Sequence, residues 1–381
     1  MGKRVDFCCR SVISPDPFLG NGEIGLPVRF AKELSYPEPV TPHNVELLRS
    51  MVVNGHAQWP GANWVELKGG GRSRVDLSRI TSVKKRAALA KQLLTTPGQR
   101  VGRHVLDGDC FLVNRQPSLH KPSIMAHVAK VLAADSLREH QTLRMHYANC
   151  NAYNADFDGD EINCHFPQSE LCRAEAKLIA ATHEQYVVPT DGKPLRGLIQ
   201  DHIDASVKLS MADCFLSRDQ FCQLAVYAGD ASEHVTLPPP AILKPVMLWT
   251  GKQVFSLIIR PNAKDDLCVS FECEEKAYNP GTDPYLCPND GYVVVRRSRL
   301  LSGSAAKRTV GDGCKTGLIY ALYRDHGAHR AASFMNRLAK LASRYLGSHR
   351  GFSIGLDDVT PSTEVKDLKA KLLAEGFAEA D

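Results

Sequence analysis

Hydrophobic residues in the first half of the chain fall in short runs that end at glycine or proline. Examples are residues 105–106 and, after the turn signal Asp107-Gly108-Asp109, residues 110–113. Short apolar runs bounded by turn residues are typical of β-strands. The pattern therefore predicts a first half that is rich in strands.

Helical spacing of apolar residues interrupts these strands and dominates the last third. It appears at residues 84–94, at 169–181 after the breaker Pro167, and at 198–209 after Gly197. Residues 317–346 repeat alanine and leucine at the same spacing, which predicts a mostly helical last third. The expected fold class is α+β, with more than one domain.

Two further stretches predict connections. Pro238-Pro239-Pro240 marks a rigid link, because consecutive prolines hold an extended backbone. Residues 262–290 are polar and contain Asp and Pro, so we expect a long surface loop or insertion there. The sequence has no internal repeat and no low-complexity tract.

Composition fits a folded protein of two or three compact units. The chain has 381 residues, of which 43% are apolar, enough to bury sizeable cores. It has no stretch of about 18 uncharged apolar residues, and Met1 is followed at once by Gly-Lys-Arg. Neither membrane insertion nor secretion is indicated, and we expect the protein to act inside the cell.

The twelve cysteines are scattered singly, without a paired C-x-x-C motif at zinc-ribbon spacing. Cys268, Cys273 and Cys287 come nearest to a ligand cluster, but their spacings fit no familiar zinc site. A free cysteine commonly behaves as a small buried hydrophobe. We interpret the cysteines as reduced thiols and expect no zinc in this chain.

The net charge of +5 is modest, but its distribution is uneven. Residues 72–103 contain many Lys and Arg residues against Asp76 as the single acidic residue. Such a segment would suit a polyanion such as a nucleic-acid backbone. A solvated basic helix explains it equally well.

The most informative feature is a cluster of carboxylates at Asp156, Asp158 and Asp160, with Gly159 between the second and third. A helix would turn Asp158 away from its two neighbours, whereas a tight loop that glycine permits can bring all three together. Converging carboxylates repel one another unless a cation lies between them. Oxygen ligands suit Mg²⁺, which keeps positions open for water or substrate phosphates. The spacing therefore predicts a magnesium site that handles nucleotides.

Three other interpretations of the cluster are weaker. In an EF-hand calcium loop beginning at Asn154, the twelfth position would be His165, where a bidentate Glu is needed. In a D-x-D-G phosphatase motif, Asp156 would be the nucleophile and Asp158 the acid, but residues 149–154 are too polar for the buried strand that precedes it. An acidic surface turn fits poorly with Phe157 inside the loop.

Residues 153–160, which read Tyr-Asn-Ala-Asp-Phe-Asp-Gly-Asp, resemble the active-site signature of the largest subunits of cellular DNA-directed RNA polymerases. Residues 114–121, Asn-Arg-Gln-Pro-Ser-Leu-His-Lys, look like a second active-site motif of that family. The likeness extends over the chain. Residues 2–7 resemble the end of a mobile switch segment, and residues 351–358 resemble the entrance to the funnel.

The resemblance implies a double-psi β-barrel whose loop carries Asp156, Asp158 and Asp160 as catalytic residues and ligands of a permanent Mg²⁺. It also implies two-metal nucleotidyl transfer, in which a second Mg²⁺ arrives with the nucleoside triphosphate and lies roughly 4 Å from the first. DNA-templated RNA synthesis would then need no protein nucleophile.

Further roles follow from the resemblance alone. Arg115 would contact the ribose of the incoming nucleotide, with help from Asn154, because a guanidinium can sense the 2′-hydroxyl. Gln116 and Pro117 would lie against the RNA–DNA hybrid, and Arg4 and Arg10 would hold template-strand phosphates. His120 receives no proton-transfer role, since a lone His is more often structural.

The resemblance also divides the chain into regions. Residues 1–80 would be a dock-like region with the end of the switch segment, and 81–187 the active-site barrel region. Residues 188–345 would be the pore region, with mixed α/β and helical structure, and 346–381 the start of the funnel. Such an enzyme would work in the nucleus, without a membrane, and would bind DNA template, RNA product and nucleoside triphosphates.

Different segments resemble different eukaryotic nuclear polymerases. Residues 5–7, 36–38, 237–245, 249–256 and 351–353 are similar to polymerase III, which transcribes small RNAs such as tRNA and 5S rRNA. Residues 146–150, 166–171 and 197–202 are more similar to polymerase I. A divergent lineage, a mosaic gene or a misassembled gene would each explain the mixture.

The resemblance places a zinc-binding clamp before Met1 and a bridge helix and trigger loop after Asp381. We therefore expect one part of a larger subunit, whose active complex needs the second-largest subunit and other polymerase subunits. The rival from another class is a non-catalytic nucleic-acid-binding or assembly protein derived from a polymerase gene. The three aspartates together with Gly159 and Arg115 favour the enzyme.

Overall fold

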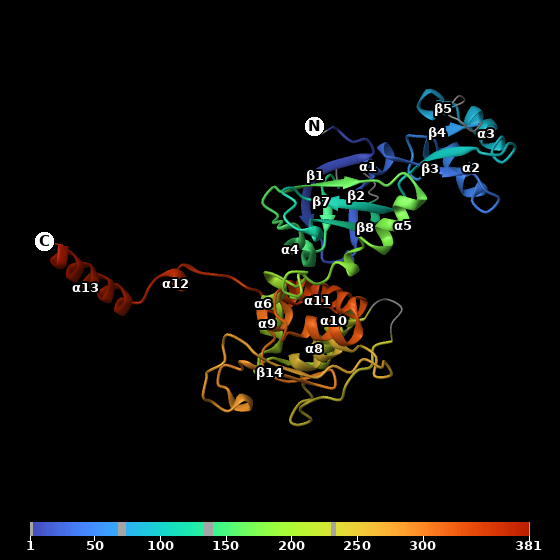
Figure 1. Cartoon of the computed structure of the whole chain (residues 1–381). Helices are drawn as coiled ribbons and strands as arrows, with labels where there is room; N and C mark the ends of the chain where they lie inside the picture. The colour runs from blue at the N-terminus through green and yellow to red at the C-terminus, as the bar shows by residue number, and fades with distance from the viewer. Residues whose placement is uncertain (1–2, 68–73, 133–139, 230–233, 381) are drawn as a thin grey trace.

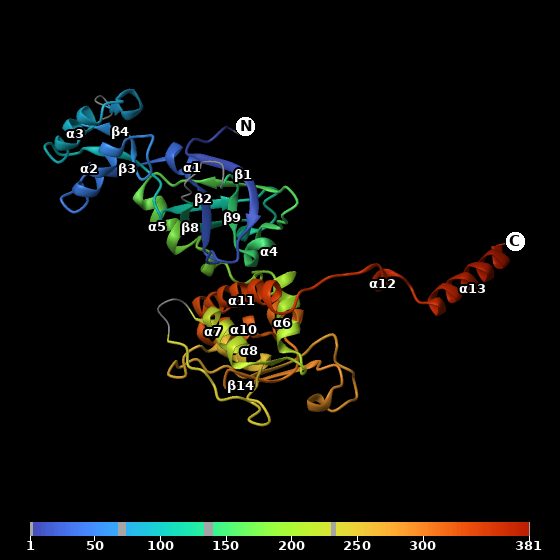
Figure 2. The ribbon, with the colours of Figure 1, turned by 180° about the vertical axis from the view of Figure 1, so that it is seen from behind.

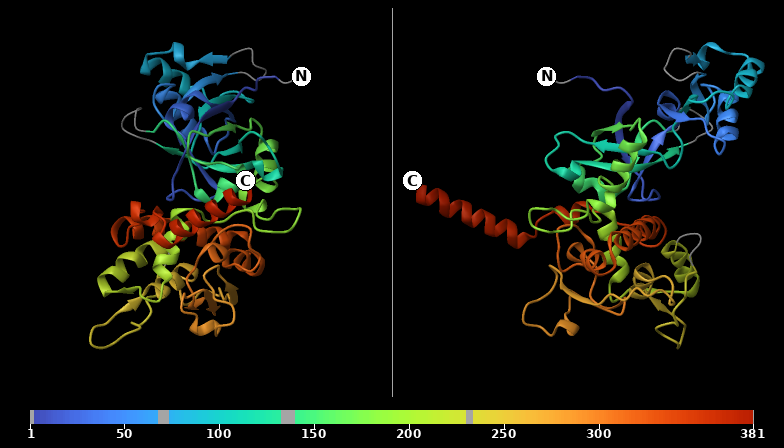
Figure 3. Two further views of the ribbon diagram at one scale, coloured as in Figure 1. Left: turned by 90° about the vertical axis from the view of Figure 1, so that its left-hand side faces the viewer. Right: turned by 45° about the vertical axis from the view of Figure 1, so that its right-hand side comes forward.

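The computed structural model describes residues 3–67, 74–132, 140–229 and 234–380. Three large hydrophobic cores among the described residues organise the chain into three lobes, and a C-terminal helix lies apart from them (Figure 1). In the views of Figure 3 the lobes follow one another along the long axis of the molecule, with the barrel lobe in the middle. Within the described ranges, no helix is long and apolar enough to cross a membrane.

The middle lobe is a closed barrel with strand order β1-β10-β7-β8-β2-β9. β1 pairs in parallel with β9 and β2 pairs in parallel with β8, whereas the other neighbours are antiparallel. This mixed, closed barrel confirms the predicted α+β fold with a double-psi β-barrel core. Its strands are β1 (Cys8–Pro15), β2 (Glu23–Pro27), β7 (Cys110–Asn114), β8 (Ile124–Leu132), β9 (Leu143–Met145) and β10 (Glu161–His165).

The long strand β8 shows why these residues form a barrel wall. Met125, His127, Ala129 and Val131 are buried, and the residues between the last three of them are exposed. This alternation matches the two-residue period of a strand with one face against a core. Three helices surround the barrel: α1 (Val28–Glu33), α4 (Cys150–Tyr153) and α5 (Glu170–Leu178).

The first lobe is a four-stranded sheet in the order β3-β6-β4-β5, covered by α2 and α3 (Figure 1). Leu48, Met51 and Val52 of α2 pack on Val65 and Val101 of the sheet. The elements are β3 (Ser35–Pro39), α2 (Val45–Asn54), β4 (Ala62–Glu66), β5 (Arg74–Asp76), α3 (Val83–Lys91) and β6 (Arg100–His104). Because β6 ends at His104, the prediction of a strand at residues 105–106 was wrong.

The third lobe packs helices against a small sheet in the order β13-β14-β15. Its helices are α6 (Asp201–Ser210), α7 (Arg218–Ala225), α8 (Gly251–Ile259), α9 (Lys307–Val310), α10 (Leu318–His326) and α11 (Ala328–Ser348). Its strands are β11 (Phe215–Leu216), β12 (Trp249–Thr250), β13 (Phe271–Glu274), β14 (Tyr292–Arg296) and β15 (Arg299–Ser302). The long loop predicted at residues 262–290 therefore contains the strand β13.

The predicted helices are present with shifted ends. Residues 84–94 correspond to α3 and residues 169–181 to α5, which Ser169 caps by accepting a hydrogen bond from the Cys172 amide (3.2 Å). The helical pattern at 198–209 begins as α6 only at Asp201. The helical pattern at residues 317–346 forms two helices, because Gly327 has a φ of 84° and ends α10.

The sheets do not follow the sequence division at residue 80. β1 and β2 of the first 27 residues belong to the barrel, and β6 pairs with β3 and β4 of the first lobe. The named regions stay predictions.

All twelve cysteines are free thiols. Of the basic segment, Arg72 lies outside the described residues, and Lys84, Lys85 and Lys91 of α3 are exposed.

The C-terminal elements α12 (Leu356–Val359) and α13 (Thr363–Ala380) extend away from the three lobes, as Figures 1 and 2 show from opposite sides. Every described residue from Gly351 to Ala380 is exposed. The compact part of the chain therefore ends with α11.

Phe111 tests the barrel core. It is fully buried and stacks on Phe166, with ring centroids 4.6 Å apart and an interplanar angle of 7°. We predict that Phe111→Ala lowers the free energy of unfolding by about 3–5 kcal/mol, because it removes buried area and leaves a cavity. Urea denaturation followed by circular dichroism measures the change. Phe18→Ala is the control, because Phe18 is 54% exposed; equal losses in both variants would contradict the assigned core.

Candidate metal centre

The aspartates lie on a short loop between helix α4 and strand β10. Asn154 ends α4 in a left-handed conformation, with φ 46° and ψ 47°, and Gly159 has a φ of 129° that residues with a side chain rarely adopt. Backbone hydrogen bonds tie both ends of the loop: the Ala155 amide donates to the Cys150 carbonyl (2.9 Å), and the Ile13 amide donates to the Asp160 carbonyl (2.9 Å). The loop is thus fixed to α4 on one side and to β1 on the other.

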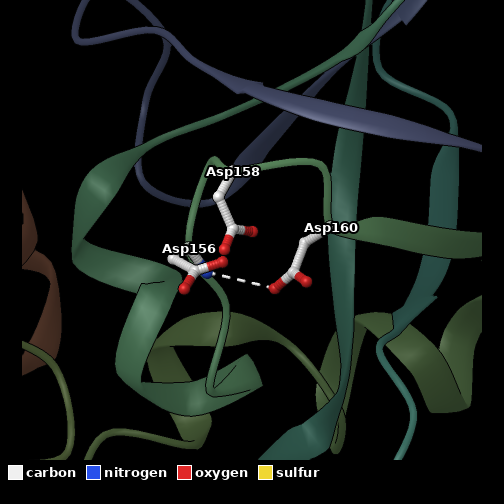
Figure 4. A group of neighbouring side chains, drawn as sticks. All are labelled: Asp156, Asp158 and Asp160. Atoms are coloured by element: carbon white, nitrogen blue, oxygen red, sulfur yellow. Dashed lines mark hydrogen bonds between the residues drawn. The ribbon is translucent and has the colours of Figure 1, made fainter.

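All three carboxylates turn toward one point, as predicted from their spacing (Figure 4). One oxygen from each of Asp156, Asp158 and Asp160 lies within 4.8 Å of the other two. Asp160 also accepts a hydrogen bond from the Asp156 amide through Oδ2 (3.1 Å), drawn as the dashed line in Figure 4. In the part of the chain that the structure describes, this is the one group of three or more acidic, His or Cys side chains close enough to share a metal ion.

The carboxylates of the cluster influence one another at Asp156. The pKa of Asp156 is raised above the usual value, first by a hydrogen bond with the Asp158 side chain and then by burial and by the negative charge of Asp158, while Asp160 and Arg115 lower it. A raised pKa means that the charged form of Asp156 is disfavoured. A bound cation would favour the charged form.

The cluster fits Mg²⁺ in its chemistry. It offers three hard carboxylate oxygens, and both Asp156 and Asp158 are exposed, which leaves an open side. Neither rival motif matches the local structure. An EF-hand needs a helix after its loop, but the strand β10 follows here. The phosphatase motif needs a strand before its loop, but α4 precedes it.

Arg115 is the cationic neighbour of the cluster. It follows strand β7, its side chain is mostly buried, and its Nε lies 2.8 Å from Asp160 Oδ2. Its Nη1 donates a longer hydrogen bond to the Tyr153 carbonyl (3.4 Å). Arg115 therefore lies directly beside the aspartates. Its contact with a ribose stays a prediction.

The other predicted site residues are distributed around this centre. Asn154 is exposed at the start of the loop, and Gln116 and Pro117 are exposed just after Arg115. Arg10 lies on β1, where it pairs with Glu161 (2.7 Å) and donates to Asn163 Oδ1 (3.3 Å). Arg4 is exposed before β1. Their predicted contacts with nucleotide, hybrid or template are untested.

A buried polar pair behind the loop was not predicted. His127 of β8 lies within 2.7 Å of the Tyr153 hydroxyl through Nε2, and its Nδ1 lies 3.3 Å from the Glu23 carbonyl. The carbonyl can only accept, so Nδ1 donates to it and Nε2 accepts from the hydroxyl. His127 lies among the inward-facing residues of a strand with alternating burial. That alternation in the sequence could have predicted that its side chain is buried.

Burial lowers the pKa of His127 to about 3 from the ordinary value of 6.5. Between these pH values the unfolded chain binds a proton at this imidazole and the folded chain does not. The free energy of unfolding therefore has its full value above about pH 6.5 and falls as the pH drops toward 3. We predict that His127→Gln reduces the pH dependence of the unfolding free energy by about 1.4 kcal/mol per pH unit in this window. Denaturation at several pH values measures the slope.

The control for this prediction is His43→Gln, because His43 is exposed. Glutamine can still accept a hydrogen bond from Tyr153 but does not titrate. An unchanged slope in His127→Gln would contradict the neutral, buried state of this imidazole.

Comparison with known proteins adds an independent line of evidence. Residues 2–182 match the family described as RNA polymerase Rpb1, domain 2, and residues 185–359 match RNA polymerase Rpb1, domain 3. The first match contains the barrel and the aspartate loop, and the second contains the third lobe. Together they account for most of the chain.

Relatives agree with this match. The chain is 44% identical to DNA-directed RNA polymerase III subunit RPC1 of Homo sapiens, over 100% of this chain and 26% of the relative. It is also 44% identical to the same subunit of Debaryomyces hansenii, over 100% of this chain and 25% of the relative. The identity to DNA-directed RNA polymerase I subunit rpa1 of Schizosaccharomyces pombe is 41%, over 99% of this chain and 23% of the relative.

The chain thus spans about a quarter of the length of the curated relatives it matches, and its likeness to polymerase III subunits is slightly greater than its likeness to the polymerase I subunit compared. The aspartate loop lies inside the matched region, on the barrel that carries it. The chain belongs to the family of the largest subunits of DNA-directed RNA polymerase, of which it contains Rpb1 domains 2 and 3.

Proposed function

We propose that this chain forms the magnesium-binding catalytic centre of a DNA-directed RNA polymerase of the polymerase III class, which synthesises RNA from ribonucleoside triphosphates on a DNA template. The convergence of Asp156, Asp158 and Asp160 beside Arg115 carries the proposal. The family membership and the 44% identity to polymerase III subunits support it. Small RNAs such as tRNA and 5S rRNA would be the products.

Asp156, Asp158 and Asp160 would hold the permanent Mg²⁺. Such an ion, when bound, lowers the pKa of a coordinated hydroxyl and stabilises charge on phosphate oxygens. The residues of the chain supply the geometry: the bonds at the two ends of the loop fix the carboxylates, and Arg115 holds Asp160 by an ion pair. The exposed side of Asp156 and Asp158 faces the space into which a nucleoside triphosphate, with a second Mg²⁺, would enter. No zinc site is proposed.

The neighbouring residues would bind substrate and nucleic acid. Arg115 and Asn154 would contact the ribose of the nucleotide, Gln116 and Pro117 would lie against the RNA–DNA hybrid, and Arg4 and Arg10 would contact template phosphates. Arg10 is paired with Glu161 in this structure, so a phosphate would have to compete with that carboxylate.

Activity would require the assembled complex in the nucleus. The second-largest subunit would complete the cleft, with other polymerase subunits around it. We assign residues 1–80 to a dock-like region, 81–187 to the active-site region, 188–345 to the pore and 346–381 to the start of the funnel. The 41% identity to a polymerase I subunit makes that class the second candidate. A non-catalytic nucleic-acid-binding derivative is the rival outside the enzymes.

The metal assignment is tested by Asp158→Ala in the complete polymerase. We predict that RNA synthesis falls by at least roughly 10²–10³-fold, the range for loss of one electrostatic stabiliser of a transition state, while assembly is retained. Primer-extension rates and size-exclusion chromatography measure the two quantities. Asp357→Ala, which removes an exposed aspartate of α12, is the matched control. Full activity in Asp158→Ala would overturn the metal assignment and favour the non-catalytic rival.

The ribose contact is tested by Arg115→Ala and Arg115→Lys. We predict that Arg115→Ala reduces the ratio of kcat/KM for a ribonucleotide over its deoxyribonucleotide by about 10- to 100-fold, as expected for one charged hydrogen bond. Lysine keeps the charge beside Asp160 but loses the guanidinium fork, so it separates the ion pair from recognition of the 2′-hydroxyl. Unchanged discrimination in both variants would exclude the ribose role.

A further inference from the structure

Two segments that lie about 50 residues apart in the sequence, residues 146–150 and 197–202, meet directly beside the aspartate loop. The ring of Tyr147 contacts the ring of His202 edge to face, with centroids 4.6 Å apart at 75°. The same tyrosine contacts Phe157 edge to face, with centroids 5.4 Å apart at 73°. Three rings therefore form a continuous row from the third lobe to the loop.

Phe157 anchors the middle of the loop. It stands between Asp156 and Asp158, which are both exposed, whereas Phe157 is half-buried and packs against the barrel core. The backbone hydrogen bonds described above hold the two ends of the loop, and the bond from the Asp156 amide to Asp160 stays within it. Phe157 is therefore the side chain that ties the middle of the loop to the barrel core.

Tyr147 stands on a rigid support. It begins a single helical turn, Tyr147–Asn149, which leads directly into α4 and the loop. His146 precedes it, is fully buried, and accepts a hydrogen bond from the Ala148 amide through Nδ1 (3.0 Å). This cap fixes the backbone from which the tyrosine ring projects.

His202 is equally constrained on the other side. It lies in the first turn of α6, is only 1% exposed, and has its Nδ1 3.3 Å from the Ile199 carbonyl. Burial lowers its pKa to about 4, so the ring is neutral at pH 7 and packs as an aromatic group. Because α6 packs against α8 and α11, the position of the His202 ring depends on the position of the third lobe.

We infer that Tyr147 and His202 are positioning residues for the catalytic loop: their rings hold Phe157, and thereby set the distances among the three aspartates. The inference deepens the proposed function and rests on it for the metal. Both rings would act through Phe157.

The test uses the full 381-residue chain with Tyr147→Ala, Tyr147→Phe and His202→Ala. Hydrogen exchange without metal reports the order of the loop through the amides of Ala155 and Asp156, both hydrogen-bonded. We expect exchange to rise about three- to tenfold in the two alanine variants, as for the loss of one aromatic pair, and phenylalanine to restore protection. Tyr285→Ala, which truncates a tyrosine that is 62% exposed, is the control.

Binding of Mn²⁺, followed by electron paramagnetic resonance, supplies the second readout. We expect Tyr147→Ala and His202→Ala each to weaken Mn²⁺ binding about three- to tenfold, and the double variant to weaken it little more than either alone, because both act through one row of rings. Asp158→Ala, in contrast, should abolish specific binding. Tyr147→Phe keeps the ring and should bind as the unaltered chain does.

The outcomes separate the two ideas. Unchanged exchange at Ala155 and Asp156 in both alanine variants overturns the positioning role, and so does faster exchange spread evenly over the barrel strands, which would show a general structural role. A different result would be faster exchange confined to the loop in the alanine variants, with Mn²⁺ binding unchanged by Asp158→Ala. That result would support the positioning role and overturn the proposed metal site.

Discussion

The crowding of three carboxylates in one short loop is the constraint on which the rest of this structure depends. Oxygen atoms of Asp156, Asp158 and Asp160 lie within 4.8 Å of one another, and the pKa of Asp156 is raised by its neighbour. A free loop would relax by moving these side chains apart. The surrounding chain must therefore hold them together in advance. Such preorganisation is what electrostatic catalysis requires, because it avoids reorganisation when the reaction occurs.

The barrel supplies that rigidity through pairings between distant segments. Strand β10 follows the loop and pairs with β1 on one side and β7 on the other. The Asp160 end of the loop is therefore held between these two neighbouring strands. On the other side, Tyr153 at the end of α4 is buried and bonded to His127 of β8. The loop thus bridges two strands of one closed sheet. A closed sheet has no free edge along which either end could slip.

Local sequence pattern predicted the loop that carries the aspartates better than it predicted the barrel around that loop. The spacing of the aspartates and Gly159 sufficed for the loop, because both the convergence and the positive φ are local properties. The closure of the barrel could not be read from local pattern, since β1 pairs with β10 about 150 residues later. For the same reason, no pattern predicted that Tyr147 meets His202. The break at Gly327 was predictable in principle, because glycine is the residue that most often ends a helix.

The join between the barrel and the third lobe shows how the two units share one polar centre. Arg196 is completely buried, and its guanidinium donates to the carbonyls of Asn21 (2.9 Å) and Thr182 (3.1 Å) and to the side chain of Asn149. A buried charge costs much free energy unless hydrogen bonds surround it, so this geometry tolerates little displacement of any partner. Asn149 lies in the turn that begins at Tyr147. The same few residues that join the lobes therefore also lead into the aspartate loop. A shift of the third lobe would reach the three aspartates through both the guanidinium and the row of rings.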